Sequence, residues 1–107
     1  MKNFKKKIEI LKLIAHPVRI RLLQELKKNI HCVSDLVKIL KLRQSTISQH
    51  LALLRKGDLV DYYVEGKERC YFIKDPFVSE LLEFLEREHY KALEVPKCCP
   101  ITKKRLK

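Results

Sequence analysis

The 107 residues suffice for one small domain, and a chain this short buries only a modest core, so a partner subunit would add burial. The formal net charge is +11, with four Lys in residues 1–7, five Lys or Arg in residues 97–107, and no acidic residue in either end, which favours a polyanionic partner. No apolar run approaches the roughly 18 residues of a membrane span and the N-terminus lacks a signal peptide's apolar core, so we expect a cytoplasmic protein with no membrane partner.

The first part of the chain predicts two amphipathic helices. Apolar residues three and four apart indicate a helix over residues 3–15, which ends where His16 precedes Pro17, because the residue before proline is pushed out of the helical region. Pro17 suits the first turn of a second helix. The two apolar stripes are Phe4, Ile8, Leu11 and Ile14, then Val18, Leu22, Leu23 and Leu26.

Residues 33–56 have the pattern of a helix-turn-helix. A short helix with a clean apolar stripe is followed by a three-residue turn and a second helix that ends at Gly57, a residue suited to the left-handed end of a helix. Two short helices joined in this way form a DNA-binding motif. The inward-facing residues are Val33, Leu36, Val37 and Leu40 in the first helix, and Ile47, Leu51 and Leu54 in the second.

Residues 59–74 change from a helical to a strand-like period. Val60, Tyr62 and Val64 alternate with polar neighbours, and residues 70–73 are rich in β-forming side chains. The four residues 65–68 between them indicate a hairpin turn. We therefore expect a two-stranded wing.

The last helix is expected over residues 76–93, because the carboxylate of Asp75 before Pro76 is a strong helix start. Its apolar surface is wider than one side of a small domain needs. This helix and the helix over residues 3–15 are therefore expected to pack against a second copy in a homodimer. Residues 96–107 follow as a basic tail that contains cysteines.

The outward face of the second helix in the helix-turn-helix carries side chains suited to DNA. They are short or amide-bearing, unlike the Glu and Lys of an ordinary solvated face: Gln44, Ser45, Thr46, Ser48, Gln49 and His50. Amides can pair with base edges, and hydroxyls near a helix N-terminus can hold phosphates. Lys67 and Arg69 at the wing tip have the length and charge to reach an adjacent groove or the backbone. Together these residues predict a double-stranded DNA partner.

Four runs in a fixed order resemble the ArsR/SmtB family of metal-responsive repressors: His16-Pro-Val-Arg-Ile-Arg-Leu-Leu, Cys32-Val-Ser-Asp-Leu, Gln44-Ser-Thr-Ile-Ser-Gln-His-Leu-Ala-Leu-Leu-Arg and Glu65-Gly-Lys. The resemblance covers residues 8 to about 90 and implies a dimeric winged helix that leaves its operator when an effector binds. Members usually carry Ser as the cap of the recognition helix. This chain has Arg43, which cannot accept the N-terminal N–H bonds and could instead contact phosphate.

The cysteines suggest what the effector is. Cys32 lies where the arsenic-sensing members of that family begin a CxC motif, but Ser34 replaces the second cysteine. The positive end of a helix would favour a thiolate at Cys32, and the basic tail would do the same at Cys98 and Cys99. These three thiolates, from one protomer or across the dimer, are candidate ligands for arsenite, antimonite or a soft divalent metal ion. Cys70, within a wing strand, is expected to be structural.

The sequence thus predicts a mainly α fold with a small β-hairpin, a winged helix-turn-helix of about five helices and a two-stranded wing, as one domain over residues 1–107. The expected function is a DNA-binding repressor without an obligatory cofactor, released by a thiophilic metalloid or metal. Two alternatives stay open: a repressor switched by thiol oxidation or polysulfide, and a constitutive winged-helix module without an effector. No catalytic triad, carboxylate pair or phosphate loop is present, so we do not expect an enzyme.

Overall fold

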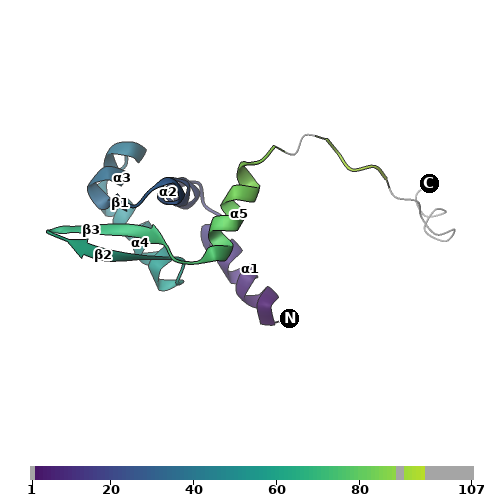
Figure 1. Cartoon of the computed structure of the whole chain (residues 1–107), viewed down its shortest axis with the longest axis horizontal. Helices are drawn as coiled ribbons and strands as arrows, with labels where there is room; N and C mark the ends of the chain where they lie inside the picture. The colour runs from purple at the N-terminus through teal and green to yellow at the C-terminus, as the bar shows by residue number, and fades with distance from the viewer. Residues whose placement is uncertain (1, 89–90, 96–107) are drawn as a thin grey trace.

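The computed structural model describes residues 2–88 and 91–95. Its described part contains five helices and a three-stranded antiparallel sheet (Figure 1). The elements in chain order are α1 (Lys2–Ile14), α2 (Pro17–Lys28), β1 (His31–Cys32), α3 (Val33–Leu40), α4 (Gln44–Lys56), β2 (Val60–Glu65), β3 (Glu68–Ile73) and α5 (Pro76–Glu86). This is the winged helix-turn-helix that the sequence predicted.

The break between α1 and α2 lies at the predicted position. His16 has extended backbone angles, φ −153° and ψ 131°, and its Nδ1 accepts a hydrogen bond of 3.1 Å from the N–H of Val18. Pro17 occupies the start of α2, where its missing N–H costs nothing. The side chain of His16 thus caps α2, and α1 leaves in a different direction.

The sheet has the strand order β1-β3-β2, so the wing contains one more strand than predicted. In the hairpin, Tyr62 lies opposite Tyr71, and the turn places Gly66 at φ +64°, a conformation that glycine adopts without strain. β1 pairs antiparallel with β3, with Cys32 opposite Cys70. Two residues are too few to show an alternating pattern, so this strand was not predictable from periodicity.

The core lies where α2 meets α3, α4, α5 and the sheet. Ten large apolar side chains in it are less than 2% exposed, and burial of each contributes roughly 1.5–3 kcal/mol. These residues fix the helix-turn-helix against the wing, so that the remaining face of α4 is left to solvent. They are Leu22, Leu23, Leu36, Ile47, Leu51, Leu54, Leu59, Val60, Val78 and Leu82.

Gly57 ends α4, but not in the expected left-handed conformation. Its φ is −83°, and the left-handed residue is Asp58, with φ +63°. A Cβ at this position would overlap Cδ2 of Leu13 in α1, so a larger residue here would have to displace the end of that side chain. The glycine therefore lets α1 approach the last turn of α4.

The last helix is shorter than predicted. Asp75 caps it as expected, with its Oδ1 accepting a 2.8 Å hydrogen bond from the N–H of Phe77. The helix ends at Glu86 instead of residue 93, because Arg87 takes extended backbone angles. Within the described residues, no helix is long and apolar enough to cross a membrane.

Candidate nucleic-acid interface

Burial of its apolar stripe leaves the polar face of α4 exposed to solvent. Ile47, Leu51 and Leu54 are all fully buried, as their spacing predicted. The helix begins after Arg43, whose extended backbone (φ −66°, ψ 147°) makes it the N-cap, and no side chain caps the first turn. The N–H groups of a first turn without a side-chain cap can bond to a phosphate placed there.

Five of the predicted DNA-contacting residues are exposed around the start of that helix: Arg43, Gln44, Ser45, Ser48 and Gln49. Thr46 is half-buried. Ser45, Ser48 and Gln49 are three and four residues apart and therefore share one face of the helix. One cation, two hydroxyls and two amides at one end of the helix can bind phosphates and base edges together.

His50 lies apart from that exposed set, although it was predicted to join it. Its Nδ1 accepts a 3.2 Å hydrogen bond from Nε of Arg19, and its ring centroid is 4.7 Å from that of His16. Burial lowers the pKa of His50, and the nearby His16 and Arg19 lower it further. Since its Nδ1 is engaged by α2, the half-buried His50 fastens α4 to α2.

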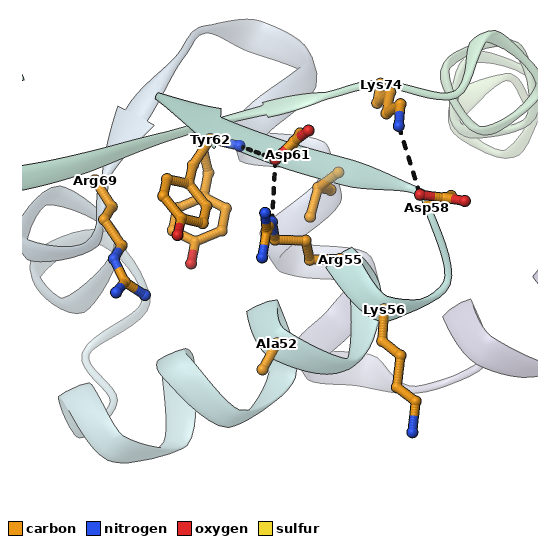
Figure 2. A pocket seen from close by; sticks show the side chains of 10 residues that line it. Ala52, Arg55, Lys56, Asp58, Asp61, Tyr62, Arg69 and Lys74 are labelled. Atoms are coloured by element: carbon orange, nitrogen blue, oxygen red, sulfur yellow. Dashed lines mark hydrogen bonds and ion pairs between the residues drawn. The ribbon is translucent and has the colours of Figure 1, made fainter. Parts of the chain in front are cut away.

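The wing places Arg69 beside α4 through an aromatic contact. The guanidinium carbon of Arg69 lies 4.9 Å from the ring centroid of Tyr62, and that of Arg55 on α4 lies 4.6 Å from the same ring. Figure 2 shows Arg55 and Arg69 on either side of Tyr62. These residues line an open groove of about 570 Å³ between α4 and the hairpin. Lys67 is exposed at the hairpin tip.

A carboxylate fixes this arrangement. Oδ1 of Asp61 accepts hydrogen bonds from Nε of Arg55 at 3.0 Å and from the N–H of Tyr62 at 2.8 Å. The Tyr62 N–H and then the guanidinium of Arg55 lower the pKa of Asp61, and the hydrogen bond to Asp61 raises the pKa of Arg55. Sequence reasoning missed these three residues as parts of the site. The sequence offered two signals for them: Arg55 ends the run that resembles the recognition helix, and Tyr62 belongs to the alternating pattern of the strand.

Cys32 is the N-cap of α3, as predicted, but its thiol is not activated. Its Sγ lies 3.6 Å from Sγ of Cys70, and its N–H donates to the carboxylate of Asp35 at 3.3 Å. The hydrogen bond with Cys70, then burial, raise the pKa of Cys32 to about 11, with Asp35 adding to the rise. The raised pKa is opposite to the stabilised thiolate that was expected at this helix end, because the Cys70 thiol contacts the sulfur and the nearby Asp35 carboxylate disfavours a second negative charge.

Cys98 and Cys99, the proposed partners of Cys32, lie outside the described residues. Cys70 is 6% exposed, which agrees with a structural role, yet sequence reasoning did not place it beside Cys32. Within residues 2–88 and 91–95, no group of three His, Cys, Asp or Glu side chains could hold a metal ion.

A helix-turn-helix with a polar outward face, flanked by a hairpin that carries Lys67 and Arg69, defines a winged-helix DNA-binding protein. A sequence model described as "Bacterial regulatory protein, arsR family" matches residues 16–62. Together with the similarities given next, this shows that the chain belongs to the ArsR/SmtB family of transcriptional regulators. The named relatives are transcriptional regulators, and this chain is likewise a transcriptional regulator and not an enzyme.

Relatives with known names span most of the chain. It is 40% identical over 78 residues to the transcriptional repressor PagR of Bacillus anthracis, covering 72% of this chain and 78% of PagR. It is 35% identical over 91 residues to the transcriptional activator HlyU of Vibrio cholerae, covering 85% and 84% of the two chains. The structure of reduced HlyU superposes with a TM-score of 0.78, at 34% identity, over 84% of this chain and 95% of HlyU.

Proposed function

We propose that this protein is a repressor that binds a specific operator through the start of α4 and the wing. The observation that carries the proposal is the exposed cluster of Arg43, Gln44, Ser45, Ser48 and Gln49, held outward by a fully buried stripe. Arg69, positioned on Tyr62, adds a second cationic contact from the hairpin. Repression, as opposed to activation, is favoured by the similarity to PagR.

The repressor acts as a homodimer in this proposal, with α1 and α5 forming the contact between subunits. Phe4, Ile8 and Leu11 on α1 are 66%, 47% and 44% exposed, and Leu85 on α5 is 51% exposed. Solvent exposure of this much apolar surface on neighbouring helices supports burial against a second copy. Two α4 helices related by a twofold axis would then read half-sites about one helical turn apart.

The effector is proposed to be a thiophilic metalloid or metal, such as arsenite, antimonite or a soft divalent ion. Support comes from the half-buried position of Cys32 at the start of α3, the first helix of the helix-turn-helix. Cys98 and Cys99 would supply the other thiolates. Binding of the effector would release the protein from its operator and so free the promoter.

The DNA proposal is tested by fluorescence anisotropy with the full chain. Duplexes from its own promoter region are compared with random duplexes of equal length at about 150 mM salt, since nonspecific binding weakens steeply with salt. We expect preference for one palindromic site and its loss in the Gln44→Ala/Gln49→Ala variant. Equal affinity for all duplexes would refute a sequence-specific repressor.

The effector proposal is tested on the protein–operator complex. Arsenite, antimonite, cadmium, zinc and polysulfide are titrated in parallel, with Cys32→Ser and Cys98→Ser/Cys99→Ser as variants. Release by a thiophilic ion that both variants abolish supports the proposal. Release by polysulfide alone would replace it with a thiol-based switch, and no release by any titrant would replace it with a constitutive module.

A further inference from the structure

The contact between Cys32 and Cys70 is a second use of cysteine that the effector proposal does not include. Their Sγ atoms are 3.6 Å apart, although the residues are 38 positions apart in the sequence. They are directly paired across β1 and β3 in the antiparallel register. Cys70 is 6% exposed and Cys32 is half-buried, so one thiol opens to solvent and the other lies behind it.

Direct pairing gives the backbone geometry that a disulfide requires. Opposite residues in an antiparallel pair have Cα atoms roughly 4.5–5.5 Å apart, and disulfides span Cα separations of roughly 4.4–6.8 Å. The two sulfurs need to close from 3.6 Å to a bond of about 2.05 Å. Rotation of the two side chains, with a small strand shift, supplies that change.

We infer that Cys32 and Cys70 form an oxidisable dithiol site, which a peroxide converts to a disulfide within one protomer. Cys32 is the attacking residue because it is the more exposed of the two. Cys70 is the resolving residue because its sulfur is already in contact with that of Cys32.

The reaction balances with one peroxide for each site. The Cys32 thiolate attacks a peroxide oxygen, the O–O bond breaks, and Cys32 becomes a sulfenic acid as the first water or alcohol leaves. Cys70 then attacks that sulfur, the S–O bond breaks, the S–S bond forms, and water leaves. Two electrons pass from the sulfurs to the peroxide, and both thiol protons end in the products.

The disulfide would join the two parts of the DNA-reading surface. Cys32 is the N-cap of α3, so its movement shifts the first helix of the helix-turn-helix, while Cys70 lies in β3, next to Arg69 of the wing. Closing the sulfurs changes the placement of α3 relative to the wing. This last consequence rests on the proposed DNA-binding function, whereas formation of the bond does not.

The test uses the full chain with Cys98→Ser/Cys99→Ser, so that only the two thiols of interest remain. After prolonged exposure to hydrogen peroxide at a pH that approaches the Cys32 pKa of about 11, we expect loss of both thiols, a mass decrease of about 2 Da and a crosslinked Cys32–Cys70 peptide in a monomeric band. Operator affinity should change roughly tenfold on oxidation and return on reduction, a typical coupling between sites.

Matched controls are Cys32→Ser and Cys70→Ala in the same background, each with one remaining thiol. Cys32 is only half-buried, so Cys32→Ser keeps the core intact even if Cys70→Ala does not fold. Persistence of both thiols, oxidation to sulfinic acid without a crosslink, or a crosslink only between chains would overturn the inference. A crosslink in a protein that binds no DNA would refute the proposed function and leave the dithiol site standing.

Discussion

Replacing Arg43 by Ser should make the protein more stable and weaken its hold on DNA. Arg43 is the N-cap of α4 and its side chain makes no cap hydrogen bond. Ser at an N-cap accepts an N–H of the first turn, which is worth about 1 kcal/mol relative to a residue that cannot cap. For a domain of this size, that free energy raises Tm by roughly 4–8 °C.

The same substitution removes one exposed cation from the proposed DNA face. Each phosphate contact contributes about 0.9 to the slope of log K against log salt, so a dimer that loses two contacts should lose about 1.8 from its slope. Arg43→Gln is the matched control, because it removes the charge without supplying a favoured cap. It should lower the salt slope equally and leave Tm nearly unchanged.

Thermal unfolding and anisotropy titrations between about 50 and 200 mM salt measure the two effects separately. An unchanged Tm for Arg43→Ser would show that the first turn of α4 is satisfied in another way. An unchanged salt slope for both variants would show that Arg43 does not contact phosphate.

Three further predictions concern the wing, the last helix and Cys32. Tyr62→Leu should lower the free energy of unfolding by about 1–2 kcal/mol and weaken DNA binding, because Arg55 and Arg69 both lose their aromatic partner. Tyr62→Phe keeps the ring and should change neither property. Denaturant titration measures the stability and anisotropy measures the DNA affinity, and equal behaviour of the two variants would refute the stacking argument. Asp75→Ala should lower the free energy of unfolding by about 1 kcal/mol, measured with denaturant, because the 2.8 Å hydrogen bond of the cap is lost. Asp75→Ser should restore most of that stability. Equal destabilisation by both substitutions would mean that the cap is unimportant. In the Cys98→Ser/Cys99→Ser background, the rate at which iodoacetamide alkylates Cys32 should still increase with pH above 9.0, the ordinary pKa of a cysteine thiol. The reason is that Cys70, Asp35 and Glu68 raise the pKa of Cys32 to about 11, and the reactive thiolate forms only as the pH approaches that value. Cys70→Ala should move this rate profile to lower pH, and a profile already level near pH 9.0 in the parent would contradict the raised pKa.

The helices and hairpin were predictable because their signals are local. The apolar spacing of Ile47, Leu51 and Leu54 fixed which side of α4 is buried, and Pro17 and Asp75 marked helix starts through their own backbone chemistry. The exposed positions of Gln44 and Ser48 followed from the same periodicity.

What could not be predicted depends on contacts between distant segments. The pairing of Cys32 with Cys70 requires β1, which is too short to leave a pattern. The stacking of Arg55 and Arg69 on Tyr62 requires the angle between α4 and the hairpin, which no single segment encodes. His50 belonged by type to the polar set, and only the position of α2 shows that Arg19 engages it.

The contact at Gly57 connects the proposed subunit interface on α1 with the proposed DNA-reading helix α4. Leu13 of α1 occupies the space that a Cβ would need, so α1 rests directly on the final turn of α4. If α1 also forms the contact between subunits, a change in the dimer interface would be transmitted to the C-terminal end of α4, the helix proposed to read DNA. A methyl group introduced at Gly57 would displace the Leu13 side chain, and a resulting change in DNA affinity would show that the contact between α1 and α4 reaches the DNA-reading surface.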